Sequence, residues 1–465
     1  MRASLGLAVV LLASCSVDPR IDDKPCPCAD GFTCVSGRCV EDGSGMDAAR
    51  PDAGDVDAAA AGDARVDAGD DAGASAGDVT VDFSIGEHAG TRVAADGALE
   101  LAGAAGTYRT EVIALSAPVP RRLGWTPDGP YAKRFPRDRA AESGYRDDAL
   151  SMRENVVLYD FPSTASMAGV AVPDLSGRGN LGQVVGSVPA VPVDAPVGSG
   201  YGFIDTNWLE TPFVNADLQL GASDWTWMTW MRTTQSSEGM VLENRTLFGM
   251  EEVGSHDPHI WFGPSHPCNG TAPGAALGGT LRSSAGTDEM SYCGTSVVND
   301  GVWHLVAMTK HGHPTATITV YVDGAPETET MTTFDGPFVF SADAAMGYAD
   351  FPGSFVTTVD LAHVTIFRRA LEALEVLAAH RRGALRVAIQ LRACADATCS
   401  DDPPFVGPDG TPETVFDDPV DNLSPPVAHD VDLTGAAFVQ LEVRMESDRS
   451  FESPRIRDLT LQLGP

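Results

Sequence analysis

Basic residues are scarce in this chain of 465 residues. It has 31 Lys and Arg against 65 Asp and Glu, which gives a formal net charge of −34. Proteins that bind nucleic acid contact the phosphates with Lys and Arg, so this acid excess argues against such a partner. The direct consequence of the charge is solubility. The chain is long enough for two or three domains, each with a buried core.

Signatures of catalytic and metal sites are also missing. The sequence contains no His-Glu-x-x-His motif and no P-loop. His256, His259 and His266 lie close together and offer one arrangement for zinc, but their segment is rich in Pro and Gly and has no helix to fix their spacing. We therefore predict a protein that is not an enzyme.

The apolar run at the N-terminus, residues 5–12, is too short to span a bilayer and has the form of a secretory signal. The next residues complete Leu-Ala-Ser-Cys at 12–15, which resembles the lipobox of bacterial lipoproteins. The resemblance implies that residues 1–14 are removed and that Cys15 carries acyl chains as a stable anchor. The residue after the Cys is Ser16 rather than Asp, and in the sorting rule of enteric lipoproteins this favours the outer membrane, at its surface or periplasmic face. An ordinary signal peptide with a chance Cys is the alternative.

Cysteine usage agrees with export. Nine Cys less the acylated one leaves eight, an even number, which predicts four disulfides in an oxidising compartment. The eight fall into three local groups: Cys26, Cys28, Cys34 and Cys39; Cys268 and Cys293; Cys394 and Cys399. The first group resembles the small EGF-like or Cys-rich knots that follow lipoprotein anchors, here residues 15–40. Its connectivity stays open, and a zinc knuckle is its alternative.

Residues 41–78 consist almost entirely of Asp, Ala and Gly and contain no aromatic residue. Such a segment cannot bury enough apolar surface to offset its ordering entropy, so we predict a disordered, extended acidic linker. Calcium loops of the Asp-x-Asp type are the alternative, but the Asp spacing is irregular and no bidentate Glu follows.

After the linker the chain has the pattern of an all-β protein, with short runs of Val, Ile, Thr, Phe and Trp between Gly, Pro and Asp clusters. One stretch, residues 368–383, has helical periodicity. Leu371, Leu374 and Leu377 recur at helical spacing, and Gly383 is in position to cap the helix.

Residues 297–326, VVNDGVWHLVAMTKHGHPTATITVYVDGAP, alternate as two strands and end in Asp323-Gly324, a tight-turn signal. Trp303 and His304 fall on opposite faces of the first strand. The segment resembles the W-H-x-V … V-Y-V-D-G block of LamG-like, concanavalin A-like jelly rolls. In that family this His is mainly structural, so we expect His304 to pack within the sheet.

Three further blocks carry the same resemblance in the family's order. They are VPDLSGRGNLGQVVG (172–186), DWTWMTWMR (224–232) and GSFVTTVDLAHVTIFRRALEALEVLAAHRRG (353–383). In the second block Trp225 and Trp227 face one way and Trp230 the other. The resemblance implies a LamG-like jelly roll, which we assign to residues 140–383.

The segments on either side resemble consecutive parts of one recurrent bacterial β-sandwich module. GTYRTEVIALSAPVPRRLGWTP (106–127) precedes the LamG-like part, and LRVAIQLRACADATC, AFVQLEVRMESD and SPRIRDLTLQL follow it. We therefore predict a discontinuous outer sandwich, residues 79–139 and 384–465, with the LamG-like domain inserted in one of its loops.

Many relatives hold a structural calcium where the opening loop meets the closing acidic strand. By that resemblance the candidate ligands are Asp174, Asn180 and Asp360. Leu361 stands where the family has a second acidic residue, which removes one potential ligand. A Gly-rich turn in which Asp174 accepts local amide hydrogen bonds is the alternative.

Together these patterns predict a lipid-anchored envelope protein whose LamG-like module recognises a glycan or protein ligand. Some concanavalin A-like folds are glycosidases with acidic residues alternating on one strand, and no such strand stands out here. A carbohydrate-active enzyme and a purely structural envelope protein are the alternatives, because fold does not decide function.

Overall fold

The computed structural model describes residues 32–35, 38–41, 78–115, 121–147, 150–211, 216–235, 247–251, 258–264, 276–284, 290–334, 336, 339–340, 343–347, 358–418, 423–426, 428–448 and 452–463. The chain divides into two units, residues 1–70 and 71–465. In the first unit β1 (Phe32–Val35) and β2 (Arg38–Glu41) form an antiparallel hairpin with Cys34 opposite Cys39. Cys15, Cys26, Cys28 and the acidic linker up to residue 77 lie outside the described residues.

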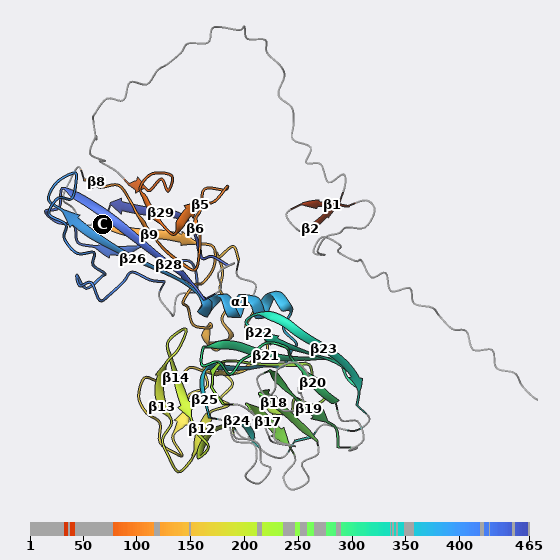
Figure 1. The fold of residues 1–465 in the computed structure, drawn as a ribbon. Helices are drawn as coiled ribbons and strands as arrows, with labels where there is room; N and C mark the ends of the chain where they lie inside the picture. Colours follow the sequence, from red (N-terminus) through yellow and green to blue (C-terminus); the bar gives the residue numbers. More distant parts are fainter. Residues whose placement is uncertain are drawn as a thin grey trace, which may run out of the picture. The chain divides into compact units, whose positions relative to one another are not determined.

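The larger unit contains a jelly roll, the inserted sandwich, made of two eight-stranded sheets (Figure 1). The helix-side sheet comprises β10 (Asn155–Tyr159), β13 (Val191–Asp194), β14 (Ser199–Phe203), β16 (Trp225–Arg232), β21 (His304–His311), β22 (Thr315–Val322), β23 (Ala325–Thr333) and β25 (Val359–Phe367). The far sheet comprises β11 (Ala171–Val172), β12 (Gly182–Gly186), β15 (Asn207–Thr211), β17 (Phe248–Glu251), β18 (His259–Pro264), β19 (Leu277–Arg282), β20 (Met290–Cys293) and β24 (Ala344–Met346).

A single hydrophobic core fills the space between these two sheets. Trp227, fully buried at its centre, stacks on Phe248 of the far sheet at 5.2 Å between ring centroids and meets Phe262 edge-on at 5.3 Å. Trp225 shares this core, whereas Trp230 points to the opposite face of the helix-side sheet. The alternation predicted for the three tryptophans is therefore confirmed.

A second, smaller sandwich is built from strands that lie before and after the jelly roll in sequence. One sheet comprises β4 (Glu87–Ala89), β7 (Ala105–Arg109), β8 (Ile113–Ala114), β26 (Leu385–Cys394) and β28 (Phe438–Ser447). The other comprises β3 (Val79–Thr80), β5 (Thr91–Val93), β6 (Leu99–Leu101), β9 (Arg121–Pro127), β27 (His429–Val431) and β29 (Arg455–Leu463). In this outer sandwich β7 pairs with β28 and β9 with β29, across more than three hundred residues of sequence.

The chain leaves the outer sandwich and returns to it at one place. The N–H groups of Ala132 and Lys133, on the outgoing segment, donate to the carbonyls of Leu385 and Arg382 at 3.0 and 3.3 Å. The outgoing segment also contains a short 3-10 turn, η1 (Arg137–Arg139), and a second turn, η2 (Ala216–Leu218), lies within the jelly roll. Strand pairing thus places the jelly roll within the sequence of the outer sandwich, and the predicted all-β fold class with two sandwiches is confirmed.

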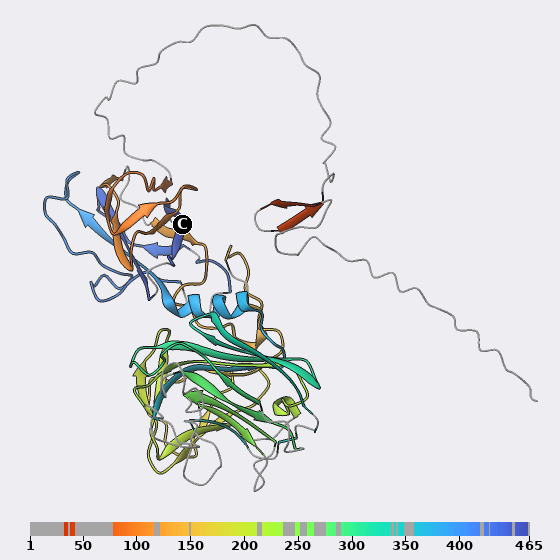
Figure 2. The ribbon, with the colours of Figure 1, turned by 45° about the vertical axis from the view of Figure 1, so that its right-hand side comes forward.

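The one α-helix among the described residues, α1 (Ala373–Ala384), covers the outer face of the helix-side sheet (Figures 1 and 2). Its N-terminus carries a capping box between Glu372 and Glu375. Val376 and Ala379 are fully buried against that sheet. Within the described residues, no helix is long and apolar enough to cross a membrane.

The helix ends differently from the prediction. Gly383 lies inside α1 rather than capping it, and the chain passes from Ala384 directly into β26. A Cβ atom at Gly383 would lie 2.5 Å from Cζ2 of Trp230, so this glycine permits close packing of the helix on the indole. Leu374 is 69% exposed, so the leucine spacing identified the helix but not its buried face.

Candidate binding cleft

Strand β21 begins at His304, and Trp303 immediately precedes it; the two side chains lie on opposite faces of the sheet. Leu305 and Ala307 pack with Trp303 in the cluster under α1, while Val306 and Met308 enter the main core. The hairpin from β22 to β23 turns at Asp323 and Gly324, which both have positive φ angles, 51° and 77°. The predicted strands and turn are therefore present, and the turn brings Asp323 beside His304.

His304 is held by two carboxylates. Its Nδ1 lies 2.9 Å from Oδ2 of Asp323, and its Nε2 lies 3.2 Å from Oδ1 of Asp300. The residue is 9% exposed. Burial alone would lower the pKa of His304, but the hydrogen bonds and charges of Asp323 and Asp300 outweigh it and raise that pKa. His304 is thus a packed strand residue that locks the β22–β23 turn onto β21.

The same residues line a cleft of about 630 Å³, the size range of small-ligand sites. The inserted sandwich contributes Pro196, Trp230, Arg232, Trp303, His304 and Asp323. His380 comes from α1, and Arg386 and Asp448 come from the outer sandwich. The wall is therefore part aromatic and part charged, and it draws on segments far apart in the sequence.

An arginine and a tryptophan form one side of the cleft. The guanidinium of Arg232 lies over the Trp303 ring, 4.9 Å from its centroid, a cation–π arrangement. The same guanidinium forms an ion pair with Asp360, Nη2 to Oδ2 at 2.7 Å. Asp360 thereby orients Arg232 against the indole.

The two other predicted calcium ligands lie together in the loop after β11. The carboxylate of Asp174 accepts hydrogen bonds from the N–H groups of Leu158, Ser176 and Asn180 at 2.8–3.0 Å and from the Ser176 hydroxyl at 2.8 Å. Asn180, fully buried, donates its side-chain amide to the Val156 carbonyl at 2.7 Å. Both Asp174 oxygens are thus occupied by protein donors.

Asp360 lies on a different part of the sheet. Asp174 bridges to Tyr159, which pairs with Val364, four residues along β25 from Asp360. Four strand residues span about 13 Å, far more than two ligands of one calcium ion can bridge. Across the described residues, no group of three His, Cys, Asp or Glu side chains is arranged to hold a metal. These three residues do not fit one calcium site, and the calcium prediction rests on the family resemblance alone.

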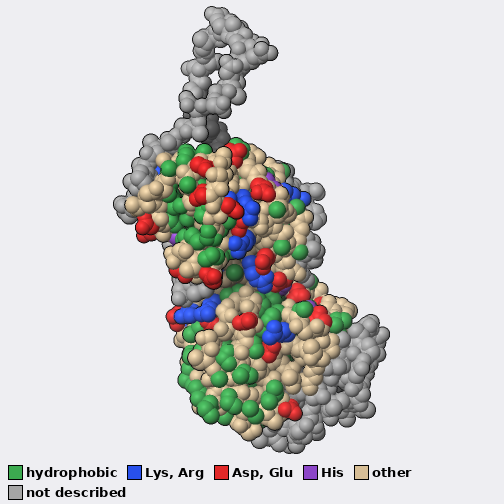
Figure 3. Space-filling view, turned by 60° about the vertical axis from the view of Figure 1, so that its left-hand side comes forward, with side chains coloured by type: hydrophobic (Ala, Val, Ile, Leu, Met, Phe, Trp, Pro, Cys, Tyr) green, Lys and Arg blue, Asp and Glu red, His purple; other side chains and the backbone are tan. Residues whose placement is uncertain are grey.

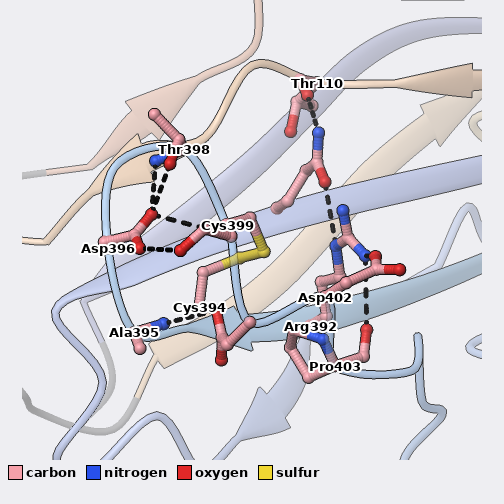
Figure 4. The surroundings of a disulfide bond; sticks show 12 residues. Thr110, Arg392, Cys394, Ala395, Asp396, Thr398, Cys399, Asp402 and Pro403 are labelled. Atoms are coloured by element: carbon pink, nitrogen blue, oxygen red, sulfur yellow. Dashed lines mark hydrogen bonds and ion pairs between the residues drawn. A yellow bond between two sulfur atoms is a disulfide. The ribbon is translucent and has the colours of Figure 1, made fainter.

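Of the predicted disulfides, the Cys394–Cys399 pair is present in the outer sandwich (Figure 4). Asp396 shapes the loop that it closes, accepting the Thr398 N–H at 2.8 Å, and hydrogen bonds from Ser400 and Thr398 lower the pKa of that carboxyl. Cys293 is disulfide-bonded. Its predicted partner, Cys268, lies outside the described residues, as do His256 and His266 of the histidine cluster.

The outward face of the far sheet carries residues that the sequence analysis did not single out. The strand register aligns Glu210 of β15, Gly249 of β17 and Trp261 of β18 in one row across the sheet. This row lies on the face opposite the core. Trp208 lies on this face and donates its indole N–H to Glu210 at 2.7 Å. His259 stacks on Trp261 at 3.9 Å between ring centroids and contacts the Thr280 hydroxyl at 3.0 Å, so its role in this structure is packing.

Comparison with known proteins supports the fold of the inserted sandwich. Residues 206–377 match the family described as the Concanavalin A-like lectin/glucanases superfamily. The jelly roll therefore has a concanavalin A-like fold. A search of curated proteins finds no match to this chain.

Several solved structures resemble part of this chain, with low sequence identity to it. Domain 4 of AbnA, a GH43 extracellular arabinanase from Geobacillus stearothermophilus, is 16% identical over 48% of this chain and 97% of its own, with a TM-score of 0.34. The binding domain of Paraclostridial Mosquitocidal Protein 1 is 12% identical, over 52% and 58%, with a TM-score of 0.37. A Trypanosoma rangeli sialidase is 14% identical, over 49% and 32%, with a TM-score of 0.33. This chain spans less than two thirds of the latter two structures.

Proposed function

We propose that this protein is a surface lipoprotein that binds a glycan or protein ligand in the cleft at Trp303. The observation that carries the proposal is the cleft itself, about 630 Å³ in volume, in which Asp360 orients Arg232 over the ring of Trp303. Ligand sites of this size combine apolar surface with a few placed polar groups. The match to the lectin/glucanase superfamily is consistent with such a role.

Anchoring is the second part of the proposal. Its support is the Leu-Ala-Ser-Cys sequence at residues 12–15, after which an acidic linker would hold the two sandwiches away from the membrane. The protein made with its own leader should partition with membranes, and Cys15→Ser should release it. Normal membrane retention of the Cys15→Ser variant would remove the lipoprotein assignment.

The binding proposal is tested with the full chain on an array of oligosaccharides and on immobilised envelope proteins. Trp303→Ala should weaken binding at least tenfold, about 1.4 kcal/mol. Trp208→Ala is the matched control, because it removes a half-buried tryptophan from the far sheet. If Trp208→Ala abolishes binding and Trp303→Ala does not, the ligand occupies the far sheet and the cleft assignment is wrong.

A carbohydrate-active enzyme is the second candidate, favoured by two carboxylates on the outward face of the far sheet. Glu210 is half-buried and Glu251 is buried. Strand spacing separates their Cα atoms by about 12 Å. The catalytic carboxylates of glycosidases lie closer together than this, so the two side chains would have to lean toward each other to act as a pair. Release of reducing ends from polysaccharides, lost in both Glu210→Gln and Glu251→Gln, would establish this activity. If both variants release reducing ends at the rate of the native chain, these carboxylates are not the catalytic pair.

A further inference from the structure

One wall of the cleft comes from the outer sandwich. Arg386, the second residue of β26, and Asp448, which follows β28, face each other in a planar, two-point ion pair with both N–O distances at 2.9 Å. The backbone fixes this pair, because the Asp448 N–H donates to the Ala384 carbonyl at 2.9 Å. The side chains remain 33% and 48% exposed. This wall is therefore polar and accessible, and its backbone is tied to the end of α1.

The arginines that line the cleft are already committed to carboxylates. Arg232 is paired with Asp360 at 2.7 Å and Arg386 with Asp448 at 2.9 Å. His304 lies between Asp300 and Asp323. Asp194, an exposed carboxylate, adds a further negative charge to the lining. A ligand with a carboxylate or sulfate would have to displace one of these partners and would meet the charge of Asp194.

Basic and acidic side chains are likewise interspersed on the face drawn in Figure 3, rather than gathered into one basic patch. An ion pair at a surface still offers hydrogen bonds outward. The guanidinium keeps N–H donors, and the carboxylate keeps lone pairs, for groups that both donate and accept. Adjacent hydroxyls on a sugar ring are such groups, and the apolar ring face suits the surface of Trp303, Val302 and Pro196.

We propose that the cleft binds an uncharged saccharide, gripped between Trp303 of the inserted sandwich and the Arg386–Asp448 pair of the outer sandwich. This inference rests on the proposed binding function and adds the ligand class and the residues that determine it. Neither sandwich alone supplies the complete site. Arg386 and Asp448 thus determine specificity: they select a hydroxyl pair and leave an anionic ligand without an unpaired cation.

The test uses the full chain and an array that carries neutral oligosaccharides, uronic and sialic acid oligosaccharides, and peptides. Arg386→Gln and Asp448→Asn should each weaken binding of the neutral ligand at least tenfold, as expected for loss of a hydrogen bond to a charged group. Arg444→Gln and Asp402→Asn are the matched controls, because both alter ion-paired residues of the outer sandwich that do not line the cleft. Both controls should bind as the native chain does.

Further readouts separate folding from recognition. Equal unfolding midpoints in all variants show that the loss is local, and Arg386→Lys, which keeps the charge but not the two-point geometry, should also bind weakly. Binding of a neutral ligand should change little between 50 and 500 mM salt, because it neutralises no charge.

The failures are distinguishable. If the native chain binds nothing on the array and none of the immobilised envelope proteins, the proposed binding function fails and this inference fails with it. If a neutral saccharide binds equally well to Arg386→Gln, Asp448→Asn and the controls, the binding function stands and the composite site is wrong. Preference for acidic saccharides, or for peptides alone, overturns the ligand class.

Discussion

The two sandwiches are stabilised in different ways. The inserted sandwich has a large aromatic core in which Trp225, Trp227 and Phe248 are fully buried between two sheets. The outer sandwich has a smaller core, and its strands are linked by ion pairs such as that of Arg457 with the buried carboxylate of Asp128. The first fold therefore depends mainly on apolar packing, and the second depends more on polar links.

A buried polar cluster joins the two sandwiches where the chain crosses between them. Lys133 lies 3.3 Å from Glu142 and 3.2 Å from Asp418, and Arg382 of α1 pairs with the same Glu142. The Tyr145 hydroxyl donates to Asp418, and burial, followed by that bond, raises the pKa of Tyr145. Removing one member would leave the others buried with fewer partners, so the cluster couples the two cores.

The largest effect is expected in the aromatic core. Trp227→Ala should lower the free energy of unfolding by about 3–5 kcal/mol, because it removes the contacts with Phe248 and Phe262 and leaves a cavity. Denaturant unfolding measures it. Leu374→Ala is the control, since Leu374 is 69% exposed, and it should change stability by less than about 0.5 kcal/mol. A loss under about 1 kcal/mol for Trp227→Ala would contradict the importance assigned to this core.

The junction comes next. Arg382→Ala should cost about 3 kcal/mol, because it removes one of the two cations paired with buried Glu142 and the donor to the carbonyls of Lys133 and Arg134. Calorimetry should show one unfolding transition for the native chain and two for the variant. Arg381→Ala is the neighbouring control, since Arg381 forms a partly exposed pair with Glu452 and should cost under about 1 kcal/mol. A single transition in Arg382→Ala would mean that the sandwiches are coupled by other contacts.

The disulfide should affect the outer sandwich alone. Cys394 and Cys399 are five residues apart, and closing so short a loop contributes about 2 kcal/mol in the chain-entropy model. The double variant Cys394→Ser, Cys399→Ser should therefore lose about that much. In the Arg382→Ala background, only the transition of the outer sandwich should shift. A shift of both transitions would contradict an effect confined to the outer sandwich.

The smallest effect is a pH dependence within the inserted sandwich. Burial lowers the pKa of His363 to about 3. In the unfolded chain His363 has an ordinary pKa near 6.5 and becomes protonated below that pH, whereas in the folded chain it stays neutral. Stability is therefore lost as the pH falls below about 6.5. Between pH 6.5 and 5.5 this one residue should cost about 1 kcal/mol.

His363→Asn tests this, because Asn does not titrate and tolerates the positive φ of 50° at this position. Its stability should fall less steeply than that of the native chain over the same pH interval. Parallel curves for the two proteins would show that His363 does not titrate as its burial indicates.

Several elements were predictable from local patterns. Alternation in residues 225–230 placed Trp225 and Trp227 on the core side and Trp230 on the other, and Asp323-Gly324 indicated the hairpin. The close pair Cys394 and Cys399 formed the predicted bond. These predictions succeeded because strand alternation, turn type and short-range disulfides depend on residues a few positions apart.

The candidate cleft was not predictable in the same way. Trp303 and His304 drew attention as a pair, yet Arg232, Arg386 and Asp448 carried no signal, because each lies on an ordinary strand or at its end. Asp360 was predicted as a calcium ligand from its place in a family motif, and in the structure its partner is Arg232. Only the pairing of β16 with β25 brings Arg232 and Asp360 together, and that pairing spans more than a hundred residues.

The sequence by itself determined the strand alternation, the Asp-Gly turn, the position of the helix and the charge that argues against nucleic acid. Each depends on local geometry or on a sum over composition. The tertiary structure decided that Gly383 packs on Trp230, that Asp360 pairs with Arg232, and that two sandwiches line one cleft. These outcomes depend on contacts between segments far apart in the chain, which form only when the sheets pair and α1 packs against them.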